Sequence, residues 1–122
     1  MASIFEATAG LAIGYPSGLG GAVIQATSKA TGVTLSKPCG TITTHDASLA
    51  GGAEVNFVVT NTFVAITDVV VLSIQSGPST GTYVASVSAV ADGSFTVTVS
   101  NLGTTAGEEL LINFAVIKAA AA

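Results

Sequence analysis

The chain has 122 residues, of which 49% are apolar and only 8% are charged, with seven acidic residues against three basic ones and a net charge of −4. This length suffices for one domain with its own core, and this apolar content argues against disorder over most of the chain. So few basic residues cannot form a basic patch, so we expect no nucleic-acid partner. Ordinary soluble domains carry roughly 25% charged residues. The low charge therefore favours a surface hidden against copies of the chain or another partner, over a neutral β domain that tolerates low charge.

The first residues, MASIFEATAGLAIG, have no basic group ahead of their apolar residues, and Glu6 comes early. This pattern does not predict a signal peptide. The apolar runs are far shorter than the roughly 18 residues that a membrane helix needs, so we expect no membrane partner. The single cysteine rules out an intrachain disulfide. This fits a protein made in a reducing cytosol, or one whose fold needs no disulfide.

Residues 1–21 differ from the rest of the chain. The stretch GYPSGLGG (14–21) concentrates glycine and proline, which predicts an extended N-terminal arm rather than a folded element. The arm nevertheless carries apolar side chains, which we expect to pack on a neighbouring subunit or another partner. This candidate interface comprises Ile4, Phe5, Leu11, Ile13 and Tyr15.

Residues 22–118 read as short strands separated by turns, with no helical periodicity. SFTVTVSN (94–101) alternates cleanly between apolar and hydroxyl side chains, and the Asp-Gly of ADG (91–93) before it predicts a hairpin turn. TDVVVLSIQ (67–75) is almost wholly apolar, which predicts a strand covered on both faces. The predicted strands cover residues 22–28, 32–36, 40–44, 53–61, 67–75, 81–90, 94–101 and 109–118. Their spacing predicts an all-β domain, an antiparallel β-sandwich or jelly roll, followed by a frayed tail over residues 119–122.

The stretch KPCGTITTHDASLAGG (37–52) contains the only cysteine and the only histidine, with an aspartate beside them. In an extended chain each residue advances about 3.3 Å, which puts Cys39 and His45 roughly 20 Å apart. A thiol activated by an imidazole needs hydrogen-bond reach. His45 and Asp46, as neighbours in such a chain, would point to opposite faces. We therefore expect a small buried thiol and a surface or interface histidine, not a catalytic pair.

Other chemistry has even less support in the residues. One cysteine and one histidine are too few for the usual zinc site. Glu108 and Glu109 are adjacent in a loop, where solvated surface is favoured over weak calcium binding. GLGGAV (18–23) lacks the third glycine and the Lys-Ser/Thr ending of a phosphate-binding loop. We predict no catalytic, cofactor-binding or metal site, and so a binding or structural role rather than an enzyme.

Four stretches together resemble a family of small virion structural proteins of tailed phages. They are GGAVIQATSKATGVTLSKPCGTITTHDASLAGGAEVNFVVTN (20–61), TDVVVLSIQSG (67–77), TYVASVSAVADGSFTVTVSN (82–101) and ELLINFAVIK (109–118). The resemblance extends over essentially residues 1–118 and transfers no catalytic residue. It implies a capsid decoration, or cement, protein that is made in the host cytoplasm and sits as a homotrimer on the outside of the head. There it would bind the major capsid protein and bridge neighbouring capsomers, with the arm residues at the capsid or subunit interface.

A second interpretation is a trimeric tail-fibre or receptor-binding module of the virion. Glycan-binding loops rely on exposed aromatic rings. The chain has only 6% aromatic residues and no tryptophan, and Tyr15 and Tyr83 are the obvious candidates. This scarcity favours the decoration role. A hydrolytic virion enzyme would need a carboxylate pair or a triad, which these residues do not assemble.

Overall fold

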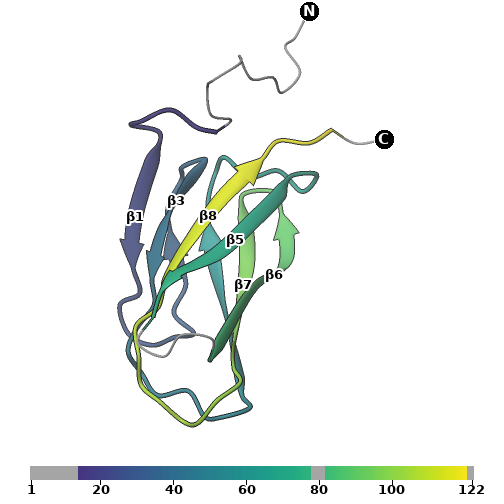
Figure 1. Cartoon of the computed structure of the whole chain (residues 1–122). Helices are drawn as coiled ribbons and strands as arrows, with labels where there is room; N and C mark the ends of the chain where they lie inside the picture. The colour runs from purple at the N-terminus through teal and green to yellow at the C-terminus, as the bar shows by residue number, and fades with distance from the viewer. Residues whose placement is uncertain (1–13, 78–81, 121–122) are drawn as a thin grey trace, which may run out of the picture.

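The computed structural model describes residues 14–77 and 82–120, a range in which the chain forms eight strands and no helix (Figure 1). The predicted interface residues Ile4, Phe5, Leu11 and Ile13 lie outside the described residues. The strands are β1 (Gly20–Ile24), β2 (Val33–Thr34), β3 (Cys39–Thr43), β4 (Glu54–Thr60), β5 (Val69–Ser76), β6 (Tyr83–Ala91), β7 (Ser94–Asn101) and β8 (Leu111–Ile117).

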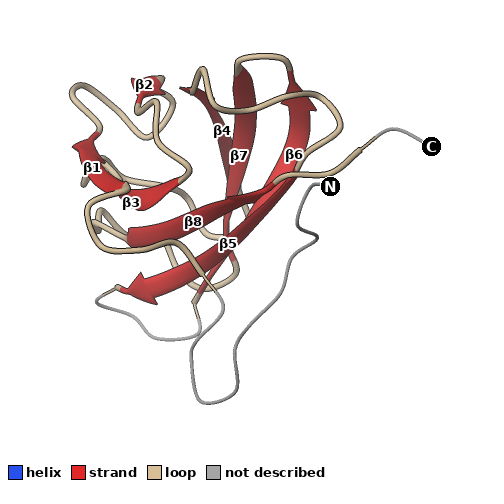
Figure 2. Ribbon diagram, turned by 90° about the horizontal axis from the view of Figure 1, so that it is seen from above, coloured by secondary structure: helices blue, strands red, loops and turns tan. Residues whose placement is uncertain are grey.

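The strands form two four-stranded sheets that pack against each other, so the predicted all-β sandwich is confirmed (Figure 2). Sheet A has the strand order β1-β3-β8-β5, and sheet B has the order β2-β4-β7-β6. The core lies between the sheets, and the outer face of each sheet points away from it.

Both sheets are mixed rather than purely antiparallel, which corrects one detail of the prediction. Four of the strand pairings are antiparallel, but β1 pairs with β3, and β2 with β4, in parallel. The reason is that the first four strands alternate between the sheets. Each crossing and return brings the chain back beside its earlier strand in the same direction, which a tight hairpin cannot do.

Strict alternation builds the core. On β7 the side chains of Phe95, Val97 and Val99 are buried while the hydroxyl side chains between them face outward, as the sequence predicts. Phe114 of β8 meets Phe95 across the core at a centroid distance of 5.4 Å. The predicted hairpin is confirmed as well: β6 ends at Ala91, β7 begins at Ser94, and Gly93 between them has a φ of 82°.

The boundaries of the sandwich lie slightly outside the predicted ones. β1 already begins at Gly20, so two glycines of the predicted arm belong to a strand that pairs with β3. A Cβ on Gly40 of β3 would lie 2.6 Å from the carbonyl oxygen of Gly21, which no side chain tolerates. At the other terminus the Ala119 N–H donates to Asp68 Oδ1 at 3.3 Å, so this first residue of the predicted tail is hydrogen-bonded to the sandwich.

Candidate arm anchor and assembly surface

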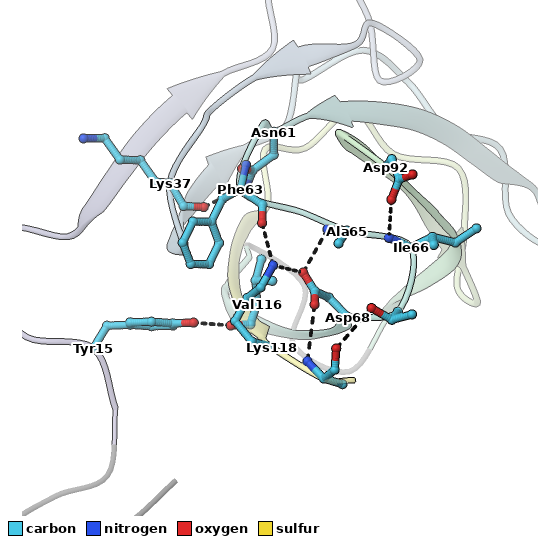
Figure 3. Close-up of polar contacts among 12 residues, drawn as sticks. Tyr15, Lys37, Asn61, Phe63, Ala65, Ile66, Asp68, Asp92, Val116 and Lys118 are labelled. Carbon is cyan, nitrogen blue, oxygen red and sulfur yellow. Dashed lines mark hydrogen bonds and ion pairs between the residues drawn. The ribbon is translucent and has the colours of Figure 1, made fainter. Parts of the chain in front are cut away.

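Tyr15, at the root of the N-terminal arm, is held by a hydrogen bond to a strand carbonyl group. That carbonyl is available because the residue opposite it is a proline. The β3–β8 register places Pro38 opposite Val116, and the Val116 N–H donates to the Pro38 carbonyl at 2.8 Å. Proline has no N–H, so the Val116 carbonyl lacks the donor that would complete the pair. The Tyr15 hydroxyl donates to this carbonyl instead (Figure 3). Tyr15 thus replaces a missing ladder hydrogen bond and seats the arm on its own sheet A.

Phe63 supports the same anchor from the loop after β4. Its ring lies edge-on to the Tyr15 ring, with centroids 6.4 Å apart and planes at 83°. The Lys118 ammonium lies 4.9 Å from the centre of the Phe63 ring and donates to the Phe63 carbonyl at 2.9 Å. Burial raises the pKa of the Tyr15 hydroxyl, so this group remains a donor at neutral pH.

A buried carboxylate ties the loops at this end together. The Asp68 side chain is almost fully buried, accepts a hydrogen bond from the Ala65 N–H at 2.8 Å and forms an ion pair with Lys118 (Figure 3). Burial alone would raise the pKa of the Asp68 carboxyl. The hydrogen bonds from the Lys118 ammonium and from two backbone N–H groups outweigh burial and hold the pKa below its ordinary value. The exposed Asp92 accepts from the Ile66 N–H at 2.8 Å in the same loop.

The opposite end of the sandwich buries a lysine. Lys29 follows β1, His45 follows β3 and Glu108 precedes β8, so all three lie at the same end. The Lys29 ammonium donates to the main-chain carbonyls of His45 and Glu108. The buried Gln25 side chain joins the same loops, accepting from the His45 N–H at 2.9 Å and donating to the Lys29 carbonyl at 2.9 Å.

Burial lowers the pKa of the Lys29 ammonium, against the opposing attraction of the acidic side chains nearby. These are Asp46, Glu108 and Glu109. Glu108 also lies beside Tyr83, where burial first and the carboxylate second raise the pKa of the tyrosine hydroxyl. At this end of the sandwich, polar side chains and loop carbonyl groups therefore gather around the Lys29 ammonium.

The structure separates the sequence candidates Cys39 and His45, as predicted. Cys39 begins β3, partly exposed rather than buried, while His45 follows the far end of that strand. The expectation that the His45 and Asp46 side chains point to opposite faces is wrong: both residues lie in the loop after β3, where their side chains meet. His45 Nδ1 lies 3.4 Å from Asp46 Oδ1 and accepts from the Ala47 N–H at 2.9 Å. Within the described ranges, no three His, Cys, Asp or Glu side chains gather as metal ligands would.

The outer face of sheet A carries no charged side chain among the described residues. The side chains that alternate with the buried ones on its strands are Ala22, Ile24, Cys39, Thr41, Thr43, Val69, Val71, Ser73, Leu111, Asn113, Ala115 and Ile117. Val69 and Val71 are 52% and 48% exposed. Among the described residues, the prediction that this strand is covered on both faces is wrong, because β5 is an edge strand whose outer face none of them covers.

Register divides this face into an apolar part and a polar row. Val69 pairs with Ile117, and Val71 with Ala115, at the end of the sheet where Tyr15 is anchored. The next row towards the opposite end is polar, and within it the Thr41 hydroxyl donates to Asn113 Oδ1 at 3.0 Å. This internal hydrogen bond lowers the cost of covering the polar row.

The outer face of sheet B is different in chemistry. Its central strand β7 presents a column of hydroxyl groups from Ser94, Thr96, Thr98 and Ser100. Glu54 is the one charged residue on this face in the part of the chain that the structure describes. These hydroxyl groups keep their hydrogen bonds to water, and the exposed Val58 and Val84 on the strands beside them, at 46% and 48%, make this face mixed rather than wholly polar.

Searches against protein-family models, curated proteins and solved structures each return no match for this chain. The resemblance to phage virion proteins stays a prediction. Over the described residues, no helix has the length and apolarity to cross a lipid bilayer.

Sequence reasoning missed most of the anchor. Tyr15 was a candidate, but its partners Val116 and Pro38, with Phe63 beside them, were not. The proline was a visible signal, since it must leave a carbonyl opposite it without a donor. Which carbonyl that is depends on the β3–β8 register, which the sequence does not specify.

Proposed function

We propose that the protein is a structural, non-enzymatic component of a phage virion, a capsid decoration protein. In this role it binds the outer surface of the head as an oligomer, with a homotrimer as the expected form. It contacts the major capsid protein and stabilises contacts between capsomers. The virion and the capsid enter the proposal through the sequence resemblance alone.

The observation that carries an assembly role is the uncharged outer face of sheet A. A contiguous, charge-free sheet face is unusual for a monomer in water and typical of a surface that meets another protein. The seated arm root supports the same role, because it fixes where the segment before it leaves the sandwich. An enzymatic role gains no support from the separation of Cys39 from His45.

The tail-fibre or receptor-binding alternative is less well supported by the aromatic residues. Tyr83 is buried in the core, so it cannot stack on a sugar. The Tyr15 hydroxyl is committed to the Val116 carbonyl, and the Phe63 ring is covered in part by Lys118. A decoration role needs no aromatic platform and is our preferred function.

Immunogold electron microscopy of intact virions tests the proposal. An antibody against this chain should label the head over its whole surface. Label confined to the tail would replace the decoration role with the fibre role. If the particles carry no label and an immunoblot detects none of this chain in them, the virion assignment is overturned.

A further inference from the structure

The apolar part of sheet A's outer face lies next to the arm root and stays open to solvent among the residues that the structure describes. Val69, Val71 and Ile117 are each about half exposed, at 52%, 48% and 46%. No described residue of the same chain covers them. The Tyr15 anchor sits on β8 at Val116, one residue from Ile117, at the same end of the sheet.

We propose that copies of this chain associate through this face, and that residues 1–13 of one copy cover the outer face of sheet A on its neighbour. The inference rests on the oligomer in the function proposed above and deepens it by naming the receiving surface. It commits to one occupant, the N-terminal segment of a second copy of this chain.

The composition of the segment matches the surface. Residues 1–13 contain one charged residue, Glu6, and a set of large apolar ones. These are Met1, Ile4, Phe5, Leu11 and Ile13. A face without charge offers no ion-pair partner to a polar peptide, and it gains most from covering by an apolar one.

The length of the segment also fits a neighbour. Thirteen extended residues reach at most about 45 Å. β8, with its seven residues, is about 23 Å long. A segment whose root is held by Tyr15 can therefore leave its own sandwich, cross a gap and still span the facing sheet.

A matched pair of variants tests the surface. Val71 of β5 and Val84 of β6 are both 48% exposed, both lie on edge strands, and they face outward from opposite sheets. Val71→Lys should reduce the sedimenting mass of the purified full-length chain to that of one chain, whereas Val84→Lys should leave the oligomer intact. Thermal unfolding of both variants controls for folding. A monomeric wild type at high micromolar concentration, or equal effects of the two variants, overturns the proposal.

A disulfide between chains tests the occupant. Cys39 lies on the outer face of sheet A in the row of Val71 and Ala115. A chain with Leu11→Cys and Cys39→Ser, mixed with wild type and oxidised, should form a disulfide that joins one chain of each kind, identified by mass. The matched control replaces wild type by a chain with Cys39→Ser and Val84→Cys, and it should form no such mixed pair. Deletion of residues 1–13 should give a single chain in solution.

Three results would contradict the assignment of residues 1–13 of a second copy as the segment that covers this face. They are an oligomer that survives this deletion, or linkage of the Leu11→Cys chain to the Val84→Cys chain in preference to wild type. A third is a Leu11→Cys variant that keeps Cys39 and forms its disulfide only within one chain. The proposed function fails separately. Virion labelling without any effect of Val71→Lys on mass would refute this inference alone, and a sheet A oligomer without virion labelling would refute the decoration role alone.

Discussion

The two ends of the sandwich each bury one charged side chain, and they stabilise it by different means. At the arm end the Asp68 carboxylate meets an opposite charge, Lys118, together with two backbone N–H groups. At the other end the Lys29 ammonium is held by two main-chain carbonyls. The loops at the first end therefore depend on an ion pair, and those at the second on a lysine that takes the place of missing main-chain donors.

The buried charged side chains of this protein share one task, which is to order the loops at the two ends of the sandwich. The outer faces of the two sheets carry hardly any charged side chains. These side chains gather instead at the ends of the sandwich, where loops leave backbone carbonyl and N–H groups without partners in a strand ladder. A buried charge with several short hydrogen bonds orders such loops more strongly than a neutral group would. Four experiments test this difference between the two ends, in order of decreasing expected effect.

Asp68→Ala should have the largest effect. It removes the acceptor for the Ala65 and Ala119 N–H groups and leaves Lys118 without its counter-ion. We expect a loss of about 3 kcal/mol in the free energy of unfolding. Urea unfolding measures it. Asp92→Ala, an exposed aspartate in the same loop system with one backbone partner, is the control and should cost about 1 kcal/mol or less. Equal losses would show that burial of Asp68 is unimportant.

Lys29→Met should have the next largest effect. Methionine keeps the apolar stem but leaves the His45 and Glu108 carbonyls without a donor. The expected loss is about 2 kcal/mol, because part of the cost is offset by no longer burying an ammonium group. Lys37→Met, at an exposed lysine, should change the unfolding free energy by less than about 0.5 kcal/mol. A Lys29→Met variant more stable than wild type would mean that burying the charge costs more than its hydrogen bonds contribute.

Tyr15→Phe should have a smaller effect. It keeps the ring beside Phe63 but removes the donor to the Val116 carbonyl, at a cost of about 1 kcal/mol. Pro38→Ala supplies the missing N–H opposite Val116, so Tyr15→Phe should cost less in that background. A double-mutant cycle in urea measures the coupling. Additive costs would argue against the proline as the reason for the Tyr15 contact.

The two ends should also differ in pH dependence, with effects smaller than those of the substitutions. The pKa of Asp68 is lowered from an ordinary value of 3.8, so its contribution is complete above that pH and is lost as the pH falls through the folded pKa. The pKa of Lys29 is lowered from 10.5, so the unfolded chain binds more protons between the two values and stability rises with pH there. Unfolding curves of wild type against Asp68→Asn in acid, and against Lys29→Met in alkali, measure each contribution. A Lys29 contribution that falls with pH would contradict the burial argument.

Much of the fold follows from local patterns. The alternation of residues 94–101 sets which β7 side chains enter the core, and Asp92-Gly93 sets the hairpin before them. The parallel pairs could not be predicted, since alternation looks the same in either strand direction. Gly21 illustrates another limit: a Cβ there would lie 2.8 Å from the Leu35 side chain, so it is a tightly packed strand position, which composition alone presents as part of a flexible arm.

Local patterns in the chain predict the class of fold, the inward side chains of β7 and the hairpin before it, because these depend on period and turn residues. Tertiary structure alone decided that Tyr15 meets Val116 and that Asp68 meets Lys118, 50 residues away. The same holds for the outer face of β5, which no described residue covers. Such contacts depend on strand order and register, which are set by packing of the whole sandwich and have no local signature in the chain.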